Sequence, residues 1–396
     1  MLRVDLRQSQ PNMKLALPVM NPQAPDRVLL KVGFALTPEI IRKLEQVGVR
    51  SIWVRYPSLD MLSQYMDPEA VRVRQEIVRD IVDAFEKMQH HAAAKLPYDS
   101  YTRSVENMIE HLATHPSAGV FLGDLADAED DLMRHGSSVT YLSLLLGMKL
   151  ESYIVRERKH IDPARAKDLA NLGVGAMLHD IGVLLLPPAV RERYRESGDD
   201  RDPQWREHPA LGFQHVRGKV EPSAATVVLN HHQRSDGSGY AGKDMPVLAD
   251  KAMHVYARIA AVADHFDALR RPVGVPPQPT VWALSAMLSE HERDKFDPIV
   301  LRALTEAVPA YPPGTIVRLS DGRHAVAIDH NPLHPCRPMV QIIPDPDTLD
   351  PNDLPFGDRI DLSELNAGLY VAEAEGHDVA ELNFGADLVR PLLHAA

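Results

Sequence analysis

Residues 230–241 read NHHQRSDGSGYA and set two histidines, His231 and His232, side by side. If they lie on a helix, their side chains point about 100° apart, so they do not easily bind one metal from the same side. A pair of neighbouring metals suits them better. The stretch therefore indicates a paired metal site and predicts that further ligands lie elsewhere in the chain.

Four further residues complete a candidate set of metal ligands: His179 with the adjacent Asp180, His208 and Asp264. A carboxylate such as Asp180 that bridges two cations about 3.5–4 Å apart is the arrangement that promotes in-line displacement at phosphorus. We therefore predict phosphoester hydrolysis, with Asp180 and His179 as catalytic residues.

The sequence around these residues favours ligation over ordinary surface positions. His179 and Asp180 follow the apolar run 170–178, where polar side chains need partners. Asp264 lies in an apolar helical stretch, where its partner is either a metal or one of the arginines Arg258, Arg270 and Arg271, and the context favours the metal. Asp267, one turn later, either supports a ligand or ends the helix.

His135 lies four residues after Asp131, so a helix would place both side chains on one face. Alone, this pair is typical of a solvated acidic helix start; beside the other ligands, metal binding is favoured. The single cysteine, Cys336, excludes an intramolecular disulfide and a thiolate zinc site, so metals must be bound by His, Asp and Glu.

Composition narrows the function classes further. A formal net charge of −12 argues against binding long nucleic acid through a general basic surface. The apolar runs are far shorter than the roughly 20 residues of a membrane span, and the N-terminus lacks the pattern of a signal peptide. We therefore expect no transmembrane segment and a cytoplasmic location.

The 396 residues are enough for two or three domains. Residues 1–58 predict a small accessory domain, with strands at 27–32 and 51–55 and a helix that Thr37 caps. Helical periodicity over 68–308 predicts an all-helical core. Residues 309–396 predict a β-rich segment: a hairpin over 314–328, a third strand at 340–343 and a further one at 369–371. The expected fold class is mainly α, with small β-containing segments at both ends.

The complete series resembles the HD-GYP family, on His135, His179-Asp180, His208, His231-His232, the segment DGSGY at 236–240 and Asp264. The resemblance covers a motif core of about 125–310. It implies an all-helical HD-domain fold and a bacterial signalling enzyme, a metal-dependent phosphodiesterase for cyclic dinucleotides, chiefly cyclic di-GMP.

By this resemblance the metal ligands are His179, Asp180, His208, His231, His232 and Asp264, with His135 as a further ligand and Asp131 in the place of an acidic residue that some members use for a third metal. Two or three divalent ions are implied, iron or manganese by resemblance, and the imidazole and carboxylate donors also suit zinc. The implied mechanism is attack on phosphorus by a hydroxide that bridges the metals, which gives linear pGpG and then possible further cleavage to GMP.

Two positions depart from the family pattern. Val183 stands where the family usually has a lysine, so a charge near the substrate phosphate is missing; turnover is then slower or the substrate differs, and Val183→Lys should raise turnover. Ala241 replaces the proline after Gly239 and Tyr240, which loosens the loop without removing a functional group.

The resemblance also implies substrate contacts from Arg234, Asp236, Gly239, Tyr240 and either Arg270 or Arg271. From sequence, Tyr240 is equally suited to stacking on a guanine and to packing on its own domain. Arg234 either reaches phosphate or forms a structural contact.

Three hypotheses follow. The first is a cyclic di-GMP phosphodiesterase; the second is a catalytically weak or inactive receptor or protein-interaction module that keeps its metals; the third, a phosphohydrolase for another nucleotide, fits the DGSGY segment less well. A mixed guanine–adenine cyclic dinucleotide is a possible ligand, the Gly-Tyr-Ala loop a possible site for a signalling partner, and homodimerisation through the flanking segments is a further possibility.

Overall fold

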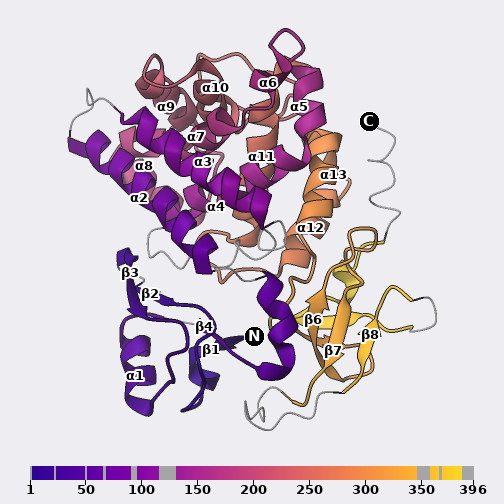
Figure 1. The fold of residues 1–396 in the computed structure, drawn as a ribbon. Coiled ribbons are helices and arrows are strands. Elements are labelled where there is room, and N and C mark those ends of the chain that lie inside the picture. The colour runs from indigo at the N-terminus through magenta and orange to yellow at the C-terminus, as the bar shows by residue number, and fades with distance from the viewer. Residues whose placement is uncertain are drawn as a thin grey trace.

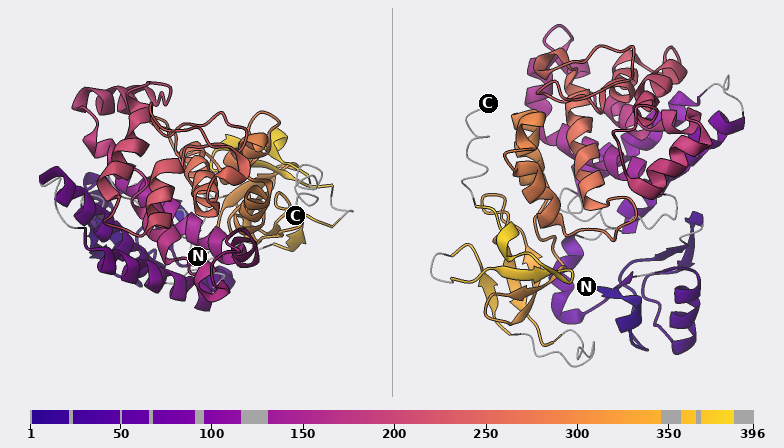
Figure 2. Two further views of the ribbon diagram at one scale, coloured as in Figure 1. Left: turned by 90° about the horizontal axis from the view of Figure 1, so that it is seen from above. Right: turned by 180° about the vertical axis from the view of Figure 1, so that it is seen from behind.

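The computed structural model describes residues 2–21, 24–49, 51–65, 68–90, 96–115, 131–345, 357–364 and 368–385. A helical body forms the upper part of the molecule in Figure 1, and an N-terminal unit and a C-terminal sheet lie side by side below it (Figures 1 and 2). This confirms the predicted fold class, mainly α with β structure at both ends. The division into three domains stays a prediction, and residues 125–130 of the predicted motif core lie outside the described residues.

The N-terminal unit consists of two small antiparallel sheets and a short helix. Its elements are β1 (Leu2–Asp5), η1 (Leu6–Gln8), β2 (Val19–Asn21), β3 (Ala24–Leu30), α1 (Pro38–Gln46), β4 (Ser51–Val54) and η2 (Pro57–Tyr65). Strand β1 pairs with β4, and β2 pairs with β3. The predicted cap is confirmed, because the side chain of Thr37 accepts a hydrogen bond from the Ile40 N–H at 3.2 Å.

The helical body begins with α2, which follows the N-terminal unit in the chain. Its elements are α2 (Pro68–His90), α3 (Tyr98–Thr114), α4 (Asp131–Lys149), α5 (Glu151–Glu157), α6 (Pro163–Ala166), α7 (Ala170–Met177), η5 (Ile181–Leu185), α8 (Pro188–Ser197), η6 (Trp205–Glu207), α9 (His208–Val216), α10 (Pro222–Asn230), η7 (Asp250–Ala252), α11 (Val255–Arg270), α12 (Thr280–Leu288), η8 (Arg293–Lys295) and α13 (Pro298–Ala307).

Helix α11 lies in the middle of this body and packs on α4 and α10. Almost every residue of α11 is buried, which is the pattern of a helix surrounded by other elements rather than of an amphipathic surface helix. Several alanines on α11 allow neighbouring helices to approach closely. A carboxylate on such a helix must have a partner, and this places strong constraints on Asp264 and Asp267.

The C-terminal segment forms a six-stranded antiparallel sheet in the order β10-β9-β5-β6-β7-β8. Its elements are β5 (Ile316–Leu319), β6 (His324–Asp329), β7 (Met339–Ile342), β8 (Arg359–Asp361), β9 (Val371–Ala374), β10 (His377–Asp378) and η10 (Ala380–Leu382). The predicted hairpin and third strand are confirmed as β5, β6 and β7. The strand predicted at 369–371 is wrong in its bounds, because pairing begins only at Val371 and Tyr370 is exposed.

The N-terminal unit and the C-terminal sheet share one hydrophobic cluster. Val326, Ile328 and Ile343 of the sheet are buried together with residues of the N-terminal unit. Full burial of one such aliphatic side chain stabilises the fold by about 1.5–3 kcal/mol. The Tyr65 hydroxyl also donates a hydrogen bond to Asp329 at 2.6 Å. The two ends of the chain therefore support each other beneath the helical body.

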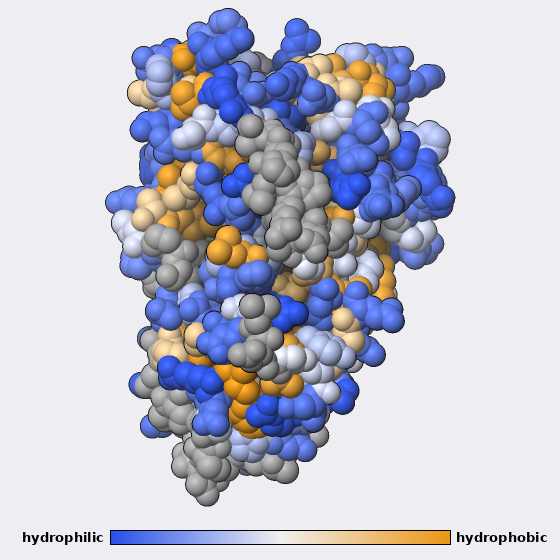
Figure 3. Space-filling view, turned by 90° about the vertical axis from the view of Figure 1, so that its right-hand side faces the viewer, coloured by the Kyte–Doolittle hydropathy of each residue, from blue (hydrophilic) through white to orange (hydrophobic). Residues whose placement is uncertain are grey.

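One stretch, Pro163–Leu185, is long and apolar enough to cross a membrane, with a mean hydropathy of 1.2. Its most apolar window is 78% buried within the protein, as expected of core helices. The face drawn in Figure 3 is largely hydrophilic, with apolar residues in separate patches. The cytoplasmic location stays a prediction.

Candidate metal centre

The structure brings together all the predicted metal ligands except Asp131. Helix α4 provides His135, the turn after α7 provides His179 and Asp180, α9 begins with His208, the end of α10 leads into His231 and His232, and α11 provides Asp264. Ligands that are up to 129 residues apart in the chain therefore meet in the helical body.

The ligand atoms form two groups that share one carboxylate. In the first, which we call the His208 group, atoms of Asp180, His208, His231 and His232 lie within 4.8 Å of one another. In the second, the His135 group, the same holds for His135, His179 and Asp180. Asp264 lies at the edge of both, with oxygens 3.0 Å from His135 Nε2 and 3.5 Å from His232 Nδ1.

Asp180 directs one oxygen toward each group. Its Oδ1 lies 3.3 Å from His208 Nε2 and 3.6 Å from His231 Nε2. Its Oδ2 lies 3.4 Å from His179 Nε2 and 3.9 Å from His135 Nε2. This is the disposition of a carboxylate that can bridge two cations, and the bridging role of Asp180 stays a prediction. Burial alone would raise the pKa of Asp180, but the surrounding imidazoles hold that pKa well below its ordinary value.

Three of the histidines are oriented by carbonyls of their own segments. The Nδ1 atoms of His179, His208 and His231 lie 2.7, 2.8 and 2.9 Å from the carbonyl oxygens of Ala176, Trp205 and Val228, each three residues earlier. A carbonyl can only accept, so each Nδ1 must carry the proton and donate. In the neutral imidazole, Nε2 is then a bare lone pair that faces Asp180.

His231 lies at the end of α10 and not within it, and this explains how adjacent histidines join one group. The helix ends at Asn230, with His231 as its C-cap, and His232 follows in a turn. The two ring centroids are 4.2 Å apart. The 100° separation expected on a helix therefore does not apply here.

The arrangement of bare nitrogens fits a cation. His208 Nε2 and His231 Nε2 lie 3.4 Å apart although both rings already donate through Nδ1. His179 Nε2 is fully buried and has no hydrogen-bond partner among the described residues. Lone pairs this close to one another and to carboxylates are stabilised only by a positive charge between them. Nitrogen and oxygen donors without sulfur suit iron, manganese or zinc.

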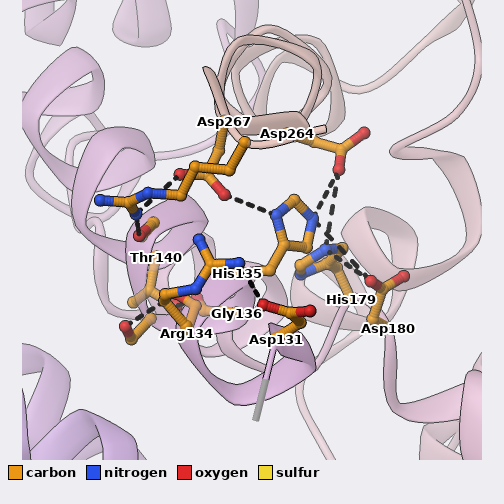
Figure 4. A network of polar contacts seen from close by, with 12 residues as sticks. Asp131, Arg134, His135, Gly136, Thr140, His179, Asp180, Asp264 and Asp267 are labelled. Carbon is orange, nitrogen blue, oxygen red and sulfur yellow. Dashed lines mark hydrogen bonds and ion pairs between the residues drawn. The ribbon is translucent and has the colours of Figure 1, made fainter. Parts of the chain in front are cut away.

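His135 is oriented differently, by a carboxylate from another helix. Its Nδ1 lies 2.7 Å from Asp267 Oδ2, and its Nε2 lies 3.0 Å from Asp264 Oδ1 (Figure 4). Burial opposes protonation, but the two carboxylates raise the pKa of His135 well above its ordinary value. Of the two roles weighed for Asp267 from sequence, the structure shows the supporting one, because it fixes the ring of His135 from behind.

Asp131 lies apart from both groups. Its side chain is 78% exposed and pairs with Arg134 at 2.6 Å (Figure 4). It shares helix α4 with His135, as the spacing predicted, but its carboxylate is engaged with this arginine. A role in a third metal site stays a prediction.

Close packing at Gly182 holds the segment that carries Asp180 against the helix that begins with His208. A Cβ at this position would lie 1.9 Å from the His208 carbonyl oxygen and 2.5 Å from the Gly212 nitrogen. Real Cβ atoms do not approach so closely. Only glycine therefore allows η5 to rest on the start of α9, which sets Asp180 beside His208.

Part of the chain is similar to known proteins. Residues 146–300 match the HD domain family. The cyclic di-GMP phosphodiesterase PA4108 of Pseudomonas aeruginosa is 30% identical over 247 residues, which cover 60% of this chain and 54% of that protein. The cyclic di-GMP phosphodiesterase response regulator RpfG of Xanthomonas campestris pv. campestris is 32% identical over 137 residues, 33% of this chain and 34% of that protein.

These matches support the HD-GYP family. The chain spans about half the length of the first of these relatives and about a third of the second. A solved structure of an HDG"Y"P protein from Bdellovibrio bacteriovorus aligns with a TM-score of 0.46 at 18% identity, over 76% of this chain and 97% of that one.

The family's signature loop follows His232 and folds back on it. Gly239 lies so close to its own loop that a Cβ would come within 2.4 Å of the Arg234 nitrogen and the His232 oxygen. The Tyr240 N–H donates to the His232 carbonyl at 3.1 Å, and its ring stacks on His232 at 4.7 Å between centroids. Asp236 accepts hydrogen bonds from Ser238 and lies exposed at the tip.

Tyr240 packs on its own domain in this structure, and its stacking on a guanine stays a prediction. His232 covers one face of its ring, and the Arg206 guanidinium lies over the ring at 4.7 Å. Packing on its own domain is what the structure shows. Arg234 likewise has structural contacts: it donates to the carbonyls of His231 and Gln233 and lies over the Phe296 ring.

The two departures from the family pattern are both buried. Val183 is 5% exposed, in an apolar cluster with Leu186, Val190 and Trp205. Ala241 is 2% exposed. A lysine at position 183 would carry its charge into apolar surroundings, so its effect on turnover depends on whether the ammonium group can reach polar atoms.

Arg270 and Arg271 extend in different directions. Arg270 donates to Thr280 at 3.0 Å and lies 3.6 Å from Glu375, at the turn between β9 and β10. Arg271 lies 3.7 Å from Asp267, the residue that supports His135. Arg271 is therefore connected with the metal-ligand network through Asp267, and which of the two arginines contacts the substrate stays a prediction.

Sequence reasoning missed Trp205, which orients a ligand, and Tyr194, which packs on Trp205. Trp205 provides the carbonyl that orients His208 and packs its ring 5.1 Å from that imidazole. Tyr194 stacks on Trp205. The signal available for Trp205 was its position three residues before His208; Tyr194 carried none, because no residue of the motif lies on its helix.

Proposed function

We propose that this protein is a metal-dependent phosphodiesterase that hydrolyses cyclic di-GMP to linear pGpG. The observation that carries the proposal is the geometry of Asp180, whose two oxygens face two groups of imidazole nitrogens. The relatives support the substrate class, since they are named cyclic di-GMP phosphodiesterases.

In this proposal His208, His231 and His232 would hold one divalent ion, His135, His179 and Asp264 would hold the other, and Asp180 would serve both. When bound, such ions polarise a phosphate and lower the pKa of a water molecule, which is the nucleophile that phosphodiester cleavage needs. We assign iron or manganese, with zinc as the third suitable metal.

The protein itself contributes orientation and exclusion of water. The carbonyls of Ala176, Trp205 and Val228 fix three imidazoles as Nε2 ligands, and Asp267 fixes a fourth. These contacts hold the donor atoms in place before a substrate arrives, so little reorganisation is needed. His208 and His231 are fully buried, which strengthens their interaction with any bound charge.

The test is an assay of manganese-loaded and iron-loaded protein with cyclic di-GMP and with the mixed guanine–adenine cyclic dinucleotide. We expect metal-dependent release of pGpG, its loss in His179→Ala, and full activity in His160→Ala, a matched change at an exposed histidine. No metal-dependent product from either substrate would refute the enzyme. Binding without hydrolysis would select the receptor, the alternative function.

A further inference from the structure

His232 is held differently from the other two histidines of the His208 group. The rings of His208 and His231 donate through Nδ1 to carbonyls three residues earlier. No carbonyl of the described residues accepts a hydrogen bond from the ring of His232, whose Nδ1 lies 3.5 Å from Asp264 Oδ2. The position of this imidazole therefore depends on how the chain next to it is held.

Gln233, which directly follows His232, is fully buried and uses both ends of its side-chain amide. Its Nε2 donates to the Pro246 carbonyl at 2.9 Å, and its Oε1 accepts from the Leu248 N–H at 3.1 Å. Because the carbonyl can only accept and the N–H can only donate, these partners fix the orientation of the amide. An ionised carboxylate lacks the donor and an apolar side chain lacks both groups, so this pair of contacts requires an amide.

The backbone beside this amide is also held by hydrogen bonds. The Gln233 N–H donates to the Asn230 carbonyl at 3.0 Å, which closes the turn at the end of α10. Two residues later, the Ser235 carbonyl accepts from the Asp250 N–H at 3.2 Å. Segment 246–250 is therefore joined to this stretch at two points. One is made by the backbone alone, whereas the other depends on the side chain of Gln233 and can be removed by substitution.

The segment that the amide binds lies at the surface. Pro246 is exposed, and the side chain between the two contacts, Val247, is 59% exposed. Apolar burial contributes little to holding such a segment in place. Without the two contacts the amide of Gln233 would be buried and unsatisfied, which favours rearrangement of the chain at this point and hence of the adjacent His232.

We propose that Gln233 is a positioning residue for His232, which it keeps in the His208 group by binding the neighbouring chain to segment 246–248. The proposal rests on the proposed function only in taking the His208 group as a metal position. It assigns to the segment after the signature loop a part in the metal centre, although this segment carries none of the ligands named above.

The experiment compares full-length wild type, Gln233→Met and Gln341→Met, each freed of metal with a chelator and then titrated with manganese. Gln341 is the matched control, because it is 5% exposed and its amide likewise donates to a carbonyl, that of Gly357, and accepts from Arg359, but in the C-terminal sheet. Methionine is close to glutamine in size and removes both contacts. The temperature of unfolding shows whether the two variants are destabilised alike, and hydrolysis of cyclic di-GMP is measured in parallel.

Loss of a contact that supports a metal ligand predicts that Gln233→Met weakens the binding of one of two manganese ions about 10- to 100-fold and leaves the other unchanged. Gln341→Met should bind both ions as the wild type does. Equal affinities in wild type and Gln233→Met, equal weakening of both ions, or no manganese binding by the wild type would overturn the proposal. If the wild type binds two ions without cleaving cyclic di-GMP and Gln233→Met weakens one of them, the proposed function fails and the role of Gln233 stands.

Leu248→Pro tests the same contact from its other side. It removes the N–H that Gln233 Oε1 accepts and leaves the buried glutamine in place. If Gln233→Met does not fold, this variant decides the question. Selective weakening of one manganese ion supports the proposal, and wild-type affinity for both ions contradicts it.

Discussion

The two groups of ligands that share Asp180 are built in different ways. In the His208 group, two fully buried imidazoles are oriented by carbonyls of their own segments. In the His135 group, the ring of His135 is 18% exposed and is oriented by Asp267, a carboxylate from another helix. A carbonyl fixes only the tautomer, whereas a carboxylate also raises the basicity of the imidazole. The first group therefore depends on local backbone geometry, whereas the second, in which a carbonyl likewise orients His179, depends in addition on how α4 meets α11.

The largest effect is expected from the residue that the groups share. Asp180→Asn keeps the shape of the side chain but removes the negative charge between the two positions. We expect loss of both metals and a fall in hydrolysis on the order of a thousandfold or more. Metal analysis of the purified variant together with the cyclic di-GMP assay measures this. Retention of two tightly bound metals would show that Asp180 does not bridge.

The next-largest effect is expected from substitutions that each remove the metal of only one group. His208→Ala should remove the metal of one group, and His135→Ala that of the other, so each variant keeps about one ion and loses most activity, roughly a hundredfold or more. Titration of each variant with manganese measures this. If either substitution empties both positions, the ligands form one site rather than two.

A smaller effect tests the carboxylate behind His135. Asp267→Asn should weaken metal binding in the His135 group about 10- to 100-fold and leave the His208 group unchanged. Asp294→Asn, at a side chain that is 80% exposed, is the matched control. Equal weakening of both metals would mean that Asp267 acts on the fold as a whole and not on His135.

The smallest effect concerns the start of α11, the helix that carries Asp264 and Asp267. Burial, with Arg158 and Arg258 nearby, lowers the pKa of His254 to about 4, and this residue caps the helix. The unfolded chain binds a proton near pH 6.5 and the folded chain does not, so stability falls as the pH drops from about 6.5 to 4, by about 2–3 kcal/mol. Urea unfolding of metal-free protein at both pH values measures it. In His254→Asn, which can still cap the helix, this part of the pH dependence should be absent; an unchanged dependence would assign it to other groups.

Much of the site could be predicted because the types of the residues and their order along the chain identify the metal ligands. His135, His179, Asp180 and the later ligands stand out through their context, and the structure places them together. The turn residues Asp321 and Gly322 likewise predicted the hairpin. These features depend on local chemistry, which a sequence displays directly.

The remaining features depend on contacts between distant segments, which no local pattern records. Tyr194 meets Trp205, the residue that orients His208, only because α8 packs on η6. The shared cluster of the N-terminal unit and the C-terminal sheet joins residues such as Leu15 and Val326 from opposite ends of the chain. The choice between Arg270 and Arg271 was open for the same reason, since it depends on where Glu375 and Asp267 lie.

The central claim is that Asp180 joins two metal positions. The most direct measurement is electron paramagnetic resonance of chelator-treated wild-type protein during titration with manganese, with bound metal counted in parallel. We predict two bound ions per chain and the spectrum of a coupled pair, since a shared carboxylate holds them about 3.5–4 Å apart. A single bound ion, or two ions with no magnetic coupling, would contradict the account.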